Sequence, residues 1–150
     1  MATIRITKIY NFEMAHVLKD YDGPCRNIHG HSYKLYVTVT GQPLSDENSP
    51  KKGMVMDFKD LKAIVKKYIV DRFDHALVIS NNTDPDMILS MKKHMEKLIV
   101  VDYQPTSEMM IIDFAKKINN RLPNTIKLHS LKLQETGTSH AEWYASDNEH

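Results

Sequence analysis

The amino-acid sequence predicts an α+β domain in which helices pack on one face of an antiparallel sheet. Two long segments, 3–18 and 28–41, alternate apolar and polar residues with the period of two that is typical of half-buried strands. Two later segments, beginning at Asp57 and Thr106, carry apolar residues at intervals of three and four, as amphipathic helices do. The order of these elements predicts a sheet of four antiparallel strands.

The two N-terminal strands flank a loop whose turn signal is Asp22-Gly23-Pro24. We therefore expect the strands to pair as an antiparallel hairpin. After a polar stretch at 42–53, Asp57 is a good helix N-cap because its carboxylate can accept from a free backbone N–H. The apolar periodicity that follows predicts a helix ending near Phe73.

The middle of the chain carries two further helix starts. Asp84 and Pro85 form an N-cap and first-turn pair that predicts a shorter helix to about Leu98. A short apolar run at 99–103 is expected to be a strand or extended. Thr106 is the expected cap of the next helix, which carries an apolar stripe.

The C-terminal part returns to strand-like patterning. Within 125–136 the apolar residues lie at even positions up to Leu128 and at odd positions from Leu131. A bulge near His129–Ser130 would bring both sets to one buried face. A final strand is expected at 140–144.

Length and composition favour one globular domain over residues 1–150, with 145–150 as a frayed tail. The chain has 20 Lys and Arg against 19 Asp and Glu, a net charge of +1, so we expect neither nucleic acid nor a membrane as a partner. The only cysteine, Cys25, excludes an intrachain disulfide, and no apolar run has the length of a membrane span. Together these features predict a cytoplasmic protein.

Three histidines are the strongest chemical signal in the sequence. His29 and His31 lie two residues apart on a predicted strand, so their side chains share a face. His16 ends the neighbouring strand and meets them if the strands pair antiparallel. Three imidazoles leave a fourth position open on tetrahedral Zn²⁺, although copper, nickel and iron also accept imidazole. If His29 and His31 are considered alone, the alternative to a metal site is a His-x-His pair that binds no metal.

Further candidates for proton transfer are scattered along the chain. Cys25 lies four residues before His29, although a lone cysteine is often inert. Asp74 and His75 follow a helix end, where a solvated surface pair is the alternative. Glu135 lies on the same face of its strand as the apolar residues, where a buried carboxylate needs a partner such as adjacent N–H groups of a ligand. The alternative is that Glu135 turns to water at the strand end.

The motifs together resemble those of the 6-pyruvoyltetrahydropterin synthase superfamily. They are FEMAH at 12–16, CRNIHGH at 25–31, GMVMDF at 53–58, DHAL at 74–77, PTSE at 105–108 and ET at 135–136. The resemblance covers nearly the whole chain and follows the family's order. The segment 80–104 is longer than in the smallest members, and the sequence assigns it no role.

The resemblance implies the tunnelling fold, in which subunits join their sheets into a barrel and two rings stack. A homohexamer, a dimer of trimers with active sites at subunit interfaces, is the expected assembly. It implies zinc on His16, His29 and His31. It also implies a proton relay and a pterin-binding set, which together comprise Cys25, Asp74, His75, Thr106, Ser107, Glu108 and Glu135, with Glu135 in both.

The short spacing of three residues between Cys25 and His29 is similar to the bacterial 6-carboxytetrahydropterin synthase branch of queuosine biosynthesis. That branch converts 7,8-dihydroneopterin triphosphate to 6-carboxy-5,6,7,8-tetrahydropterin, acetaldehyde and triphosphate. The alternatives are a 6-pyruvoyltetrahydropterin synthase of tetrahydrobiopterin synthesis, a non-catalytic metal- or pterin-binding protein on the same scaffold, and a tunnelling-fold aldolase without the metal trio.

Overall fold

A long antiparallel hairpin forms the centre of the structure. The computed structural model describes residues 1–149 and pairs β1 (Ile4–His16) with β2 (His29–Gly41) along their whole length. Ile4 lies opposite Gly41 at one end and His16 lies opposite His29 at the other. The predicted hairpin is therefore confirmed, and its register brings the two predicted histidine-bearing strand ends together.

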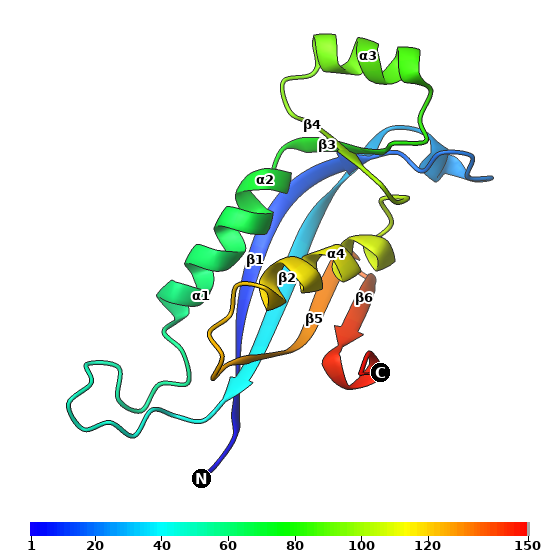
Figure 1. Ribbon diagram of the computed structural model, residues 1–150. Helices are drawn as coiled ribbons and strands as arrows, with labels where there is room; N and C mark the ends of the chain where they lie inside the picture. The colour runs from blue at the N-terminus through cyan, green and yellow to red at the C-terminus, as the bar shows by residue number, and fades with distance from the viewer. Residues whose placement is uncertain (150) are drawn as a thin grey trace.

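The sheet within residues 1–149 has six strands in the order β4-β3-β1-β2-β5-β6, so the prediction of four is wrong (Figure 1). The strands beyond these four are β3 (Ala76–Ser80), which was not predicted, and β4 (Leu98–Val101), which confirms the apolar run at 99–103 as a strand. They run parallel to the end of β1, which makes the sheet mixed rather than antiparallel. All five residues of β3 are buried, and the four apolar residues that precede Ser80 lack the alternation that identifies a strand.

Two helical segments form a layer that covers one face of the sheet (Figure 1). The first is a continuous helical segment, α1 (Phe58–Val65), a π-helical stretch (Lys66–Val70) and α2 (Asp71–Phe73). It ends where the sequence predicts. The second is α4 (Ser107–Asn119).

The expected caps begin both of these helices. The Asp57 carboxylate accepts a hydrogen bond from the Lys59 amide, and the Thr106 hydroxyl accepts one from the Met109 amide. Each bond satisfies a backbone donor that has no partner inside its own helix. The two helix starts are therefore fixed by the residues that predicted them.

The helix α3 (Pro85–His94) packs on the opposite face, so the prediction that the helices share one face is wrong for it (Figure 1). Met91 of α3 packs against Leu77 and Ile79, while Ala76 and Val78 of the same strand face the main core. A strand buried on both sides needs cover on both sides, and α3 supplies the second layer.

The end of α3 also differs from the prediction, because Met95 is extended and Leu98 already begins β4. The segment 80–104 therefore builds this second layer and the β4 edge of the sheet. The predicted start of α3 is confirmed, because the Asp84 carboxylate accepts hydrogen bonds from the amides of Asp86 and Met87.

The main core is an aromatic cluster between the sheet and the helices. The rings of Phe12 and Tyr33 stack with their centroids 5.2 Å apart. Phe114 of α4 contacts Phe12 edge-on at 6.2 Å and Phe73 at 5.1 Å. Phe12, Tyr33, Phe73 and Phe114 are all nearly inaccessible, so α2 and α4 are held to the strands by one continuous contact.

The strand β5 (Lys127–Thr136) is irregular at two points. Its pairing with β2 skips His129, which confirms the predicted bulge and lets Leu128 and Leu131 face the same core. Its pairing with β6 (Ser139–Tyr144) skips Glu135. The second irregularity was not predicted, and it lies at a candidate site residue.

The predicted frayed tail, 145–150, begins with a short 3₁₀ helix (Ala145–Asp147), and its last residue lies outside the described residues. None of the helices in residues 1–149 is both long and apolar enough to cross a membrane.

Replacing Phe114 with alanine tests the aromatic core. Phe114→Ala removes a fully buried ring, so the free energy of unfolding should fall by about 3–5 kcal/mol in urea denaturation. The control is Ile112→Ala on the same helix, where the side chain is 40% exposed and the expected change is below about 1 kcal/mol. Equal losses for the two variants would contradict the described packing.

Candidate metal centre

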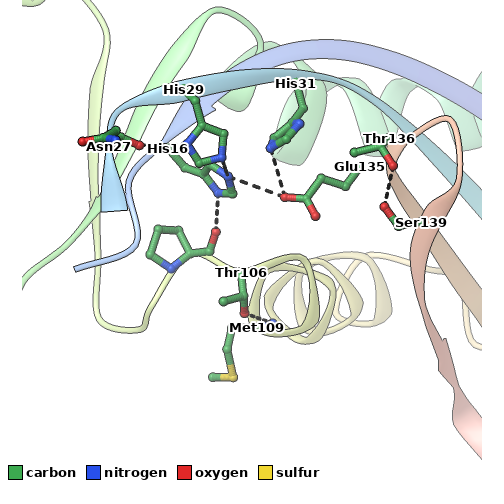
Figure 2. A network of polar contacts seen from close by, with 10 residues as sticks. His16, Asn27, His29, His31, Thr106, Met109, Glu135, Thr136 and Ser139 are labelled. Atoms are coloured by element: carbon green, nitrogen blue, oxygen red, sulfur yellow. Dashed lines mark hydrogen bonds and ion pairs between the residues drawn. The ribbon is translucent and has the colours of Figure 1, made fainter. Parts of the chain in front are cut away.

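His16, His29 and His31 gather at the end of the central hairpin, as predicted. The β1–β2 register sets His16 opposite His29, and the strand period of two puts His31 on the same face as His29. The Nε2 atoms of His16 and His29 are 3.0 Å apart. One ligating nitrogen from each ring lies within 4.8 Å of the others (Figure 2).

Two of the rings are oriented by backbone carbonyl groups. His16 Nδ1 lies 2.7 Å from the Pro105 carbonyl oxygen, and His29 Nδ1 lies 2.8 Å from that of Asn27. A carbonyl oxygen can only accept, so each Nδ1 donates its hydrogen. In the neutral rings Nε2 then carries the lone pair, which is the form that binds a metal.

Burial keeps the rings of His16 and His31 neutral. His16 is 1% exposed, and its desolvation lowers the pKa of the imidazole, as do the neighbouring histidines. Hydrogen bonding to Pro105 and the charge of Glu135 oppose this shift without cancelling it. Desolvation likewise lowers the pKa of His31. Both side chains therefore present neutral nitrogen near pH 7.

The nitrogen atoms are poorly satisfied by the protein itself. Within residues 1–149 the buried Nε2 of His31 has no hydrogen-bond partner. The Nε2 lone pairs of His16 and His29 face each other at a separation of 3.0 Å. A divalent cation about 2.0–2.1 Å from each nitrogen would convert this repulsion into three bonds. The residues present therefore fit a metal ion.

A carboxylate lies beside the three rings. Glu135 Oε1 is 3.2 Å from His31 Nε2 and 3.5 Å from His16 Nε2 (Figure 2). The side chain is 27% exposed. Its strand is bulged at this residue, and bulges commonly redirect a side chain. The carboxylate faces the histidines rather than turning to water at the strand end.

Asp74 and His75 form a second polar pair at the turn between α2 and β3. Asp74 Oδ1 accepts from the Glu13 amide at 2.8 Å, and Oδ2 lies 3.0 Å from His75 Nδ1. The hydrogen bond from the Glu13 amide, followed by those of His75, lowers the pKa of the Asp74 carboxyl. Asp74 is thus ionised and orients the His75 ring.

The backbone of His75 is held in the left-handed region, with φ of 63°. Its amide donates to the Glu13 carbonyl at 2.6 Å, so both backbone groups of Glu13 fix this turn. A non-glycine residue adopts this conformation at a cost, and such strain is found most often at functional sites. The His75 side chain itself is 77% exposed.

His75 and Cys25 are not brought together within one chain. His75 lines a surface hollow with Glu13, Ser32 and Lys97, and Cys25 does not line it. Glu13 and Ser32 alternate with core residues, so their side chains lie on the sheet face opposite the three histidines, and His31 also contributes to the lining of the hollow. Cys25 is half-buried in a 3₁₀ turn (Pro24–Arg26) of the loop between the histidine strands.

The start of α4 lies next to the histidines, because the Pro105 carbonyl that orients His16 immediately precedes it (Figure 2). The Thr106 hydroxyl caps the helix. Ser107 is 4% exposed, and within the described residues its hydroxyl has no hydrogen-bond partner. Glu108 is exposed in the first turn.

Three groups around the histidines were not predicted. The carbonyl groups of Pro105 and Asn27 act through the backbone, so residue type carries no signal for them. Tyr33 contacts the rings of His31 and His16 edge-on, with centroids 5.6 and 6.4 Å apart. Its position two residues after His31 on the same strand face could have indicated this contact.

Comparisons with known proteins identify a family for this chain. Residues 5–146 match the profile of the family described as 6-pyruvoyl tetrahydropterin synthase. The 6-carboxy-5,6,7,8-tetrahydropterin synthase of Haemophilus influenzae is 38% identical over 143 residues, covering 93% of this chain and 97% of that protein. The protein of the same name from Synechocystis is 33% identical, with coverage of 93% and 92%.

Solved structures share the fold. An uncharacterized protein from Wolinella succinogenes superposes with a TM-score of 0.80 at 22% identity, covering 97% of this chain and 99% of that chain. The 6-pyruvoyl tetrahydropterin synthase of Caenorhabditis elegans gives 0.65 at 24% identity, with 97% of each chain covered. Sequence, fold and the histidine cluster therefore agree that the chain belongs to the 6-pyruvoyl tetrahydropterin synthase family.

Proposed function

We propose that this protein is a zinc-dependent 6-carboxy-5,6,7,8-tetrahydropterin synthase that acts in queuosine biosynthesis. Its substrates are 7,8-dihydroneopterin triphosphate and one water molecule, and its products are 6-carboxytetrahydropterin, acetaldehyde and triphosphate. The observation that carries the proposal is the convergence of three imidazole nitrogens beside the Glu135 carboxylate. Relatives that bear this enzyme's name at 33–38% identity support the choice of reaction.

The pterin ring binds between Glu135 and the start of α4. The Glu135 carboxylate accepts from the adjacent N–H groups of the amino-pyrimidinone edge, which compensates the cost of keeping a charge in a half-buried place. Thr106, Ser107 and Glu108 complete the pocket, and the unpartnered Ser107 hydroxyl offers a further hydrogen bond. This arrangement directs the side chain of the substrate toward the three histidines.

Zinc, when bound, supplies a Lewis acid that lowers the pKa of the substrate hydroxyl groups. Cys25 and His75 transfer the protons. The Asp74 carboxylate holds the Nδ1–H of His75, so that Nε2 is the nitrogen that accepts or releases a proton. Its orientation does not require substrate, because the Glu13 backbone already fixes the turn.

A complete site requires a second copy of the chain. The hollow that holds His75 is also lined by His31, but Cys25 lies outside it. In the proposed homohexamer, a dimer of trimers, a neighbouring subunit brings its His75 to Cys25. The edge strands β4 and β6 have unpaired backbone groups through which the sheets can join into a barrel. The cytoplasmic location stays a prediction.

Product analysis tests the reaction. Zinc-loaded protein incubated with 7,8-dihydroneopterin triphosphate should release acetaldehyde, triphosphate and 6-carboxytetrahydropterin in equal amounts, measured by liquid chromatography and mass spectrometry. Formation of a 6-pyruvoyl product without acetaldehyde would assign the chain to the other synthase branch. Recovery of unchanged substrate would support a binding protein instead.

Replacing Cys25 tests its part in proton transfer. Cys25→Ala should lower kcat at least about 100-fold, because general acid–base groups contribute about 10²–10⁴-fold. Zinc content and circular dichroism should stay at the wild-type level, since Cys25 is not among the clustered metal-ligand candidates and is only half-buried. Unchanged turnover in this variant would remove Cys25 from the mechanism.

A further inference from the structure

Glu135 makes contacts that pterin binding alone does not explain. Its Oε1 atom lies 3.2 Å from His31 Nε2 and 3.5 Å from His16 Nε2, the two nitrogens that point into the candidate metal centre. A carboxylate that only binds substrate does not need to contact these two nitrogen atoms. Figure 2 shows the carboxylate beside the rings, with Oε1 directed toward His16 and His31.

These contacts do not have the character of hydrogen bonds. His31 Nε2 has no hydrogen-bond partner within residues 1–149, although Oε1 is 3.2 Å away, so the oxygen does not lie along an N–H direction. In neutral His16 the hydrogen is on Nδ1, where it is donated to Pro105, and Nε2 holds a lone pair. A carboxylate oxygen facing lone pairs at this distance is repelled unless a cation lies between them.

Glu135 also has freedom to move. The β5–β6 pairing passes from Gln134 to Thr136, so the bulge leaves Glu135 itself without a paired residue on β6. Its side chain is 27% exposed, which keeps it within reach of an entering ligand. His16, by contrast, is 1% exposed and tied to Pro105. Of these two residues, Glu135 is therefore the one suited to leaving the cluster.

We infer that Glu135 is a displaceable fourth ligand of the metal centre, bound to the ion when no substrate is present and released from it when a pterin arrives. The inference rests on the proposed function for the identity of the displacing ligand. Adjacent N–H donors of a pterin compete for the same carboxylate, so Glu135 cannot serve the ion and the substrate fully at once. Recognition of the ring therefore opens the coordination position that the substrate side chain needs.

Cobalt substitution tests the ligand assignment without any pterin. Co²⁺ replaces zinc, and its visible absorption reports the number and kind of ligands. Glu135→Gln should change the spectrum of the Co²⁺ protein and raise the Kd for Co²⁺ at least about tenfold. The matched control is Glu142→Gln, which alters an exposed carboxylate 3.1 Å from His140 on the neighbouring strand, and which should leave both quantities unchanged. Identical spectra and affinities for wild type and Glu135→Gln would overturn the inference.

Titration with 7,8-dihydroneopterin, which lacks the triphosphate, tests the displacement. The spectrum of wild-type Co²⁺ protein should shift toward that of substrate-free Glu135→Gln, while the variant changes much less. Pterin binding that is seen by calorimetry and leaves the wild-type spectrum unchanged would overturn the release step. A fourth ligand found in the cobalt experiment together with no product from the triphosphate substrate would uphold the coordination and reject the proposed reaction.

Discussion

The register of the β1–β2 hairpin is the constraint on which the site depends. It sets His16 opposite His29, and the alternation of the strand then places His31 on the same face. A slip of one residue would turn the histidines of one strand to the other side of the sheet. The same register buries Phe12 and Tyr33 under α4, so the aromatic core that stabilises the fold also holds the histidines in place.

The other parts of the centre are brought to this hairpin by separate elements. The chain before α4 supplies the Pro105 carbonyl that orients His16, and the bulge in β5 accompanies the turn of Glu135 toward the rings. Both depend on the packing of α4 and β5 against the hairpin. The candidate metal centre is thus formed by three segments that are distant in sequence. Its geometry therefore depends on the packing of the core that holds these segments together.

Much of this arrangement could be predicted, because the alternation of apolar and polar residues and the helix caps are local signals in the sequence. Alternation predicted the common face of the histidines, and Asp57 and Thr106 marked the helix starts. The strand β3 was missed because its uniform burial removes alternation, and the same burial requires α3 to cover the side that faces away from the main core. The Pro105 carbonyl has no sequence signal. In the proposed assembly, Cys25 meets His75 of another copy of the chain, a contact that the sequence of one chain does not encode locally.

The central claim is that His16, His29 and His31 hold one zinc ion through their Nε2 atoms. Anomalous diffraction at the zinc absorption edge, from crystals of the zinc-loaded protein, tests it most directly. The account predicts one peak per chain at about 2.0–2.1 Å from all three nitrogens. A peak bound elsewhere, or density that leaves the three rings uncoordinated, would contradict it.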